Sequence, residues 1–318
     1  MSHETVSGGD SVSSQGPSLL RCAGFLGLAS VLVVVGGLAH EPPPTLVYPV
    51  DLVVGGSGWV VADFKAHGLL ELSVDGTVKP IVQGRGMPRT PLYGTRALIS
   101  APDGDGWLVA DPGTFGLYRV SAAGELSTIT TELDIPQGLA RFDDSSVLVS
   151  DLRSGIGGVM RVTLDGRVTE LAQINSPKGI VVDGDSFVVV SHGERALFRL
   201  TRDGRVSTLA SGPPFDFLHD IVRDPDGSFV VTDGYASALF RVSASGQINV
   251  LAQGEPLVNP QGIVRSEGGD YVVVDPQARA VFRVSSTGEV VRLVDVTGDS
   301  GEDFLGSGTY TVGAARNQ

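Results

Sequence analysis

The chain has 318 residues, 42% of them hydrophobic and 19% charged, which excludes a wholly disordered protein because there is ample apolar surface to bury. Acidic residues outnumber basic ones by 36 to 23, and the resulting net charge of −13 predicts no binding to nucleic acid. The single cysteine, Cys22, excludes an intrachain disulfide and a cysteine-based metal site. The 43 glycines follow no collagen repeat and predict many turns between short strands.

The N-terminal region resembles an export segment. Residues 1–21 are polar, and an uninterrupted apolar run follows over residues 23–39. We expect residues 22–39 to form a hydrophobic helix that is either a signal peptide, with a cleavage site at Gly37-Leu38-Ala39, or a membrane anchor. A buried core helix is the alternative, but the prolines at 42–44 separate the run from the rest of the chain. Residues 40–47 are then a linker, and the location is extracytoplasmic, with membrane contact only if 22–39 is retained.

An internal repeat predicts the fold. An apolar run that ends in Asp or Ser recurs at Trp59–Asp63, Trp107–Asp111, Val147–Asp151, Phe187–Ser191, Phe229–Asp233 and Tyr271–Asp275. A second apolar run, a turn glycine and a final strand follow in each unit. The turn glycines stand at 76, 124, 166, 204, 246 and 288. Four short strands in about 42 residues make one propeller blade. The chain is therefore predicted to be all-β, a six-bladed β-propeller of four-stranded blades over residues 48–295, with a C-terminal tail over 296–318.

The repeated signature resembles that of a known superfamily. Units open with Pro136-Gln-Gly-Leu139, Pro177-Lys-Gly-Ile180 or Pro260-Gln-Gly-Ile263, and their third strands end in Arg-Val or Arg-Leu. This pattern resembles the NHL-repeat propellers and the related gluconolactonase, strictosidine-synthase and streptogramin-lyase propellers. The resemblance implies a six-bladed fold, and it leaves lactonase, lyase and plain binding functions open.

Strand alternation predicts which residues meet at one mouth of the central channel. Residues that open the innermost strands and residues that follow the second strands should lie there together. The opening positions are Val50, Arg96, Gln137, Lys178, His219 and Gln261, and the next positions are Asp51, Ala97, Gly138, Gly179, Asp220 and Gly262. The glycines predict close approach of neighbouring blades. Asp51, His219 and Asp220 depart from the repeat, and departures favour a functional site.

These residues support three readings of the mouth. His219 and Asp220 are candidate catalytic residues, and with Asp51 they are the candidate ligands of one divalent metal ion. Alternatively, His219 is a general base, with Lys178 and Arg96 holding an anionic group. In the third reading, the polar groups only form hydrogen bonds across a wet channel. The predicted ligand-binding residues are Asp51, Arg96, Gln137, Lys178, His192 and Gln261.

Other recurring polar residues have structural readings beside functional ones. The Asp that ends each second strand is interpreted as an acceptor for backbone N–H groups in a turn, and only unit four departs, with Ser191-His192. The third-strand arginines (119, 161, 199, 241, 283) are expected to form ion pairs at a blade edge. The Asp-Gly turns at 103–106, 183–185 and 224–227 are either calcium loops or plain hairpin turns. The long connections 84–96 and 213–217 are either a lid or inert surface.

The resemblance does not transfer a catalytic centre. Gluconolactonase-type enzymes bind metal through acidic and Asn side chains at this mouth, and here the equivalent places hold Val50, Gln137, Lys178 and His219. Streptogramin lyases use a His with nearby acids, which His219 matches loosely. The sequence favours an exported or membrane-anchored propeller that binds a small molecule, a peptide or a partner protein at the mouth. The alternative is a metal-assisted hydrolase or lyase.

Overall fold

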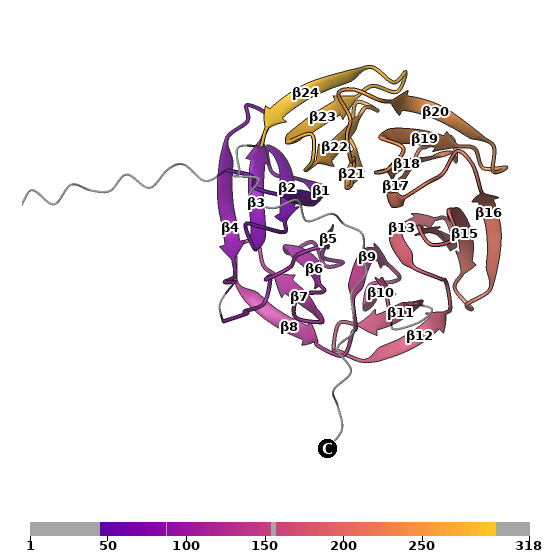
Figure 1. Cartoon of the computed structure of the whole chain (residues 1–318). Coiled ribbons are helices and arrows are strands. Elements are labelled where there is room, and N and C mark those ends of the chain that lie inside the picture. The colour runs from indigo at the N-terminus through magenta and orange to yellow at the C-terminus, as the bar shows by residue number, and fades with distance from the viewer. Residues whose placement is uncertain (1–44, 87, 154–156, 297–318) are drawn as a thin grey trace, which may run out of the picture. The chain divides into compact units, whose positions relative to one another are not determined.

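The computed structural model describes residues 45–296, apart from 87 and 154–156. These residues form six four-stranded antiparallel sheets that surround a central channel as the blades of a propeller (Figure 1). The six-bladed all-β prediction is confirmed. The predicted helix over residues 22–39 lies outside the described residues. Within the described ones, no helix is long and apolar enough to cross a membrane.

Every blade is built from four consecutive strands, numbered outward from the channel. Blade 1 consists of β1 (Pro49–Gly55), β2 (Gly58–Asp63), β3 (Gly68–Ser73) and β4 (Val78–Gln83). Blade 2 consists of β5 (Ala97–Ser100), β6 (Trp107–Asp111), β7 (Gly116–Val120) and β8 (Leu126–Thr130). Blade 3 consists of β9 (Pro136–Arg141), β10 (Ser146–Asp151), β11 (Gly158–Thr163) and β12 (Val168–Ala172).

The remaining blades follow the same order. Blade 4 consists of β13 (Pro177–Asp183), β14 (Ser186–Ser191), β15 (Ala196–Thr201) and β16 (Val206–Ser211). Blade 5 consists of β17 (Leu218–Arg223), β18 (Phe229–Asp233), β19 (Ala238–Val242) and β20 (Ile248–Gln253). Blade 6 consists of β21 (Ile263–Arg265), β22 (Tyr271–Asp275), β23 (Ala280–Val284) and β24 (Val290–Asp295).

The hydrophobic core lies between the blades. The second strands are continuous apolar runs because both of their faces are covered, and every residue of β10, β18 and β22 is buried. Phe142 of blade 3, for example, stacks on Phe187 of blade 4 with ring centroids 5.6 Å apart. Each blade therefore depends on its neighbours for its core.

Side-chain packing closes the ring between blades 6 and 1. Each described sheet contains strands of one blade only, so no strand is exchanged there to join the two ends. Instead Leu52 and Leu70 of blade 1 pack with Val272 and Val281 of blade 6 in one buried cluster. Leu46, just before β1, joins the same cluster. Burial of these side chains holds the seam.

The repeated turn glycine has a conformational reason. All six, from Gly76 to Gly288, adopt φ between 80° and 98° in the turn that joins the third and fourth strands. Residues with a Cβ rarely adopt this left-handed backbone, which explains why glycine recurs at this point in every blade.

Candidate functional site

The structure brings the predicted ring of opening residues together. A cavity of about 160 Å³ lies in the channel, and its lining includes all six of them: Val50, Arg96, Gln137, Lys178, His219 and Gln261. Asp51 and Asp220 also line it, while His192 does not. Further along the channel the lining becomes aliphatic, with Leu139, Ile180 and Ile221 among its residues. The cavity lining is therefore mostly polar where the innermost strands begin and aliphatic further along these strands.

Asp51 and Asp220 bind the backbone of neighbouring blades. Asp51 accepts hydrogen bonds from the Leu52 N–H (2.8 Å) and from the Leu98 N–H of blade 2 (2.9 Å). Asp220 of blade 5 accepts one from the Ile263 N–H of blade 6 (3.1 Å). Both carboxylates thus join adjacent innermost strands, which is a structural role that the sequence did not reveal.

The inner-strand glycines make room for these acids. A Cβ added at Gly179 would lie 2.5 Å from Asp220 Oδ1, and one added at Gly262 would lie 3.0 Å from Asp51 Oδ1. The acid of one blade therefore fills the space that the glycine of the preceding blade leaves open. The repeated glycines and the two acids that depart from the repeat therefore form one arrangement.

Burial also changes the protonation of the two acids. Burial, together with the charge of Asp220, raises the pKa of Asp51 well above its usual value. Burial raises the pKa of Asp220 to about 6. Asp51 is thus held in its neutral form over a wider pH range than an exposed aspartate.

Lys178 is a buried amine without an acidic partner among the described residues. Its side chain is largely covered, its Nζ donates a hydrogen bond to Gln137 Oε1 at 3.3 Å, and it lies 5.4 Å from the centroid of the Phe217 ring. Burial and, next, the charge of Arg96 lower the pKa of Lys178 well below its usual value. These surroundings therefore favour the neutral amine.

The two histidines contact the same aromatic side chain rather than each other. The centroid of the Phe217 ring lies 4.7 Å from that of the His192 ring and 5.0 Å from that of the His219 ring. Phe217 also stacks on the exposed Tyr235, with ring centroids 4.5 Å apart. Burial, followed by the charge of Lys178, lowers the pKa of His219 well below its usual value and that of His192 to about 4. Both imidazoles are neutral at physiological pH.

No acid of the described residues contributes to the electrostatic surroundings of His219, which are set by Lys178, Arg96, His192 and Asn259. Its Nε2 is buried without a hydrogen-bond partner among the described residues, and so is Asn259 Oδ1. Both atoms lie against Gly234, within 2.7 Å of the place where a Cβ would stand. Asn259 was not singled out from the sequence, although it directly precedes the Pro260-Gln-Gly segment that opens blade 6. Phe217 was flagged only as part of a long loop.

The donors needed for a metal are not gathered. In the part of the chain that the structure describes, no three His, Cys, Asp or Glu side chains form a group that could hold a metal ion. Asp51 and Asp220 direct carboxylate oxygens to backbone N–H groups instead. The residues as arranged do not fit the predicted metal site of His219, Asp220 and Asp51.

The Asp that ends each second strand acts as the expected turn acceptor. Asp275, for example, accepts hydrogen bonds from the N–H groups of Val258, Asn259 and Ala278. In blade 4, Ser191 replaces the carboxylate, and its Oγ accepts from the Glu194 N–H at 3.1 Å. These residues hold the mouth loops in place.

The long connection between blades 1 and 2 is a packed loop. Leu92 is fully buried, the Gly94 N–H donates to Asp111 Oδ1 at 2.9 Å, and His67 stacks on Tyr93 at 5.0 Å. Of the described residues between 84 and 96, only Arg96 lines the channel cavity. The loop therefore contributes Arg96 to the cavity.

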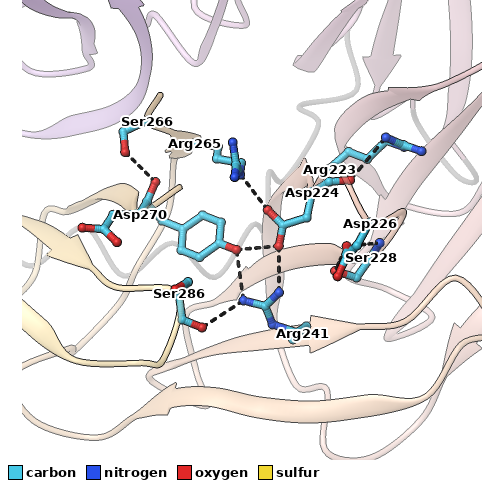
Figure 2. Close-up of polar contacts among 10 residues, drawn as sticks. Arg223, Asp224, Asp226, Ser228, Arg241, Arg265, Ser266, Asp270 and Ser286 are labelled. Atoms are coloured by element: carbon cyan, nitrogen blue, oxygen red, sulfur yellow. Dashed lines mark hydrogen bonds and ion pairs between the residues drawn. The ribbon is translucent and has the colours of Figure 1, made fainter. Parts of the chain in front are cut away.

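At the opposite ends of the strands, the Asp-Gly turns bind arginine. Figure 2 shows Asp224 accepting from Arg241 (2.8 Å) and from Arg265 of the next blade (2.9 Å). The Tyr271 hydroxyl donates to the same carboxylate at 2.6 Å. Asp183 pairs in the same way with Arg199 and Arg223. These contacts confirm the structural reading of the third-strand arginines and give the turns a role that needs no calcium.

Comparison with known proteins identifies the class of fold. No protein-family model and no curated protein sequence matches the chain. Virginiamycin B lyase from Staphylococcus aureus matches with a TM-score of 0.61 at 18% identity, over 81% of this chain and 88% of the lyase. Its catalytically inactive histidine-to-alanine variant with quinupristin matches with a TM-score of 0.62 at 17% identity, over 80% and 87%.

Two other solved structures extend the range of functions. A gluconolactonase from Xanthomonas campestris matches with a TM-score of 0.60 at 16% identity, over 73% of this chain and 84% of that one. An auxiliary nutrient binding protein from Bacteroides thetaiotaomicron gives 0.61 at 11% identity, over 78% and 70%. The chain is a six-bladed propeller structurally similar to virginiamycin B lyase and gluconolactonase, as the sequence signature predicted. Because these relatives include enzymes and a binding protein, the fold leaves the specific function open.

Proposed function

We propose that the propeller binds a small organic anion in the channel mouth. The observation that supports this most directly is the buried amine of Lys178, which forms no ion pair with a carboxylate among the described residues. The charge of Arg96 lies near it. A buried base without a counterion costs stability, and such groups cluster at functional sites. An anion bound beside Lys178 would supply a counterion for this amine.

The shape of the cavity defines the ligand class. Its volume of about 160 Å³ is close to the roughly 150 Å³ of an engineered cavity that binds benzene. The charged end of the ligand would meet Arg96 and Lys178, and its hydrocarbon part would lie against Leu139, Ile180 and Ile221. A monocarboxylate of a few carbon atoms suits this arrangement. A peptide or a protein partner would contact only the rim.

A hydrolase or lyase acting at the same mouth is the second candidate. It is favoured by the neutral His219 and by the similarity to a lyase whose histidine-to-alanine variant is described as catalytically inactive. In the metal-assisted form, Asp51 and Asp220 would first have to release the backbone N–H groups that they bind. We therefore rank anion binding first.

Export and an extracytoplasmic location remain predictions from residues 22–39. Membrane contact through this segment depends on whether it is retained. Its processing is tested by determining the N-terminal residue of the mature protein.

The test of anion binding is calorimetric titration of the full chain with acetate, pyruvate and benzoate. Binding should be lost in Lys178→Met and retained in Lys79→Met, because Lys79 is an exposed lysine of β4. Titration in buffers of different ionisation enthalpy should show proton uptake, since an anion favours the charged form of Lys178. Equal weak binding by both variants would contradict the proposal.

A further inference from the structure

The chain has three lysines, and their surroundings differ sharply. Lys79 is exposed on outer strand β4, Lys65 lies above the Tyr48 ring at 5.4 Å, and Lys178 lines the channel cavity. Lys178 is thus the only lysine among the cavity-lining residues. A single amine in a small cavity is a chemically addressable site.

The surroundings of Lys178 suit a nucleophile. Gln137 Oε1 accepts a hydrogen bond from Nζ at 3.3 Å, and the Phe217 ring lies on one side. The charged and titratable groups around it are Arg96, His192 and His219. Asp51 and Asp220, one position further along their strands, line the same cavity. Burial and the charge of Arg96 both disfavour the ammonium form, which is how reactive lysines are activated. The lowered pKa of Lys178 agrees with this geometry.

We propose that Lys178 forms a covalent imine with the carbonyl carbon of a small oxo acid whose carboxylate is bound by Arg96. This proposal rests on the proposed anion site and names the reactive group that the anion carries. An aldehyde or ketone acid of two to four carbon atoms is the ligand class that combines the required charge, size and electrophilic carbon.

The reaction is a condensation without oxidation or reduction. The Nζ lone pair forms a bond to the carbonyl carbon while the C=O π electrons move to oxygen. The two amine protons then leave with that oxygen as one water molecule, and a C=N bond remains. No cofactor is needed, because the unprotonated fraction of Lys178 attacks the carbonyl carbon and Arg96 orients the acid.

The test traps the imine in the wild-type full chain. The protein is incubated at neutral pH with glyoxylate and cyanoborohydride, and adducts on Lys178, Lys65 and Lys79 are quantified by peptide mass spectrometry. The adduct on Lys178 should exceed that on Lys79 by about tenfold or more in the folded protein and equal it in urea. An adduct on Lys178 no more abundant than that on Lys79 in the folded protein would overturn the proposal.

Two further arms separate the imine from simple anion binding. Arg96→Gln should reduce labelling by glyoxylate by a severalfold larger factor than labelling by neutral acetaldehyde. Loss of the Arg96 charge raises the pKa of Lys178 and so affects both reagents, but only the acid also loses its bond to the guanidinium. If acetate binds in a Lys178-dependent way and no adduct forms, anion binding stands and the imine is refuted. If neither acetate binding nor an adduct depends on Lys178, both proposals fail.

Discussion

Replacing Asp275 by alanine should destabilise the propeller strongly. The carboxylate accepts hydrogen bonds from three backbone N–H groups, those of Val258 (2.8 Å), Asn259 (3.0 Å) and Ala278 (2.8 Å). A net loss of roughly 0.5–1.5 kcal/mol for each of these three hydrogen bonds gives about 1.5–4.5 kcal/mol in the free energy of unfolding. The same contact recurs in other blades, so the result bears on the whole mouth.

Two further variants test this reasoning: a serine at position 275, as blade 4 has at the equivalent position, and an alanine at an exposed turn as the control. Asp275→Ser should fall between wild type and Asp275→Ala, because Ser191 holds the equivalent turn with one accepted backbone hydrogen bond. Asp185→Ala, at an exposed turn position, should change stability by less than about 0.5 kcal/mol. Urea unfolding followed by tryptophan fluorescence gives the three values. A loss below about 1 kcal/mol for Asp275→Ala would refute the claim that this carboxylate holds the loop.

Three more predictions concern the inner strands and the opposite face. Gly138→Ala places a Cβ 2.2 Å from a backbone carbonyl of the next blade and should cost about 1–3 kcal/mol in urea unfolding, whereas Gly268→Ala, with open space, should cost little. Because the pKa of Asp220 is raised to about 6 in the folded protein, ionisation of Asp220 destabilises the fold as pH rises through that value. The free energy of unfolding of the wild type, measured relative to that of Asp220→Asn, should therefore fall by about 2–3 kcal/mol between pH 4 and pH 7. Tyr271→Phe removes the hydroxyl that donates to Asp224 and should lower the free energy of unfolding by about 1–2 kcal/mol. Calorimetry should show this as a lower melting temperature, and an unchanged melting temperature would show that the two arginines suffice to hold Asp224.

The fold was predictable because its determinants are local and repeated. The apolar second strands and the turn glycines each recur in every unit, so six units predicted six blades. Strand alternation also predicted correctly that Arg96, Lys178 and His219 meet at one mouth. These inferences needed only periodicity and strand direction.

The roles of individual mouth residues were not predictable from the repeat. From the sequence, Asp51 and Asp220 were interpreted as acids available to a ligand, but each accepts a hydrogen bond from the backbone of an adjacent blade. Such a contact joins residues that are distant in the sequence, for example Asp220 and Ile263. Whether Lys178 has a carboxylate partner likewise depends on how blades pack. The contact of both histidines with Phe217 depends on a loop conformation that no repeat specifies.

The most direct test of the account is an NMR titration of lysine labelled with 13C at Cε. The three lysines give few signals, and the Lys178 signal is assigned with Lys178→Arg. Without ligand, Lys178 should titrate well below the ordinary lysine value near 10.4, and saturating acetate, which cannot form an imine, should raise its midpoint. A Lys178 signal that titrates at the ordinary value and does not respond to acetate would contradict the proposed binding site.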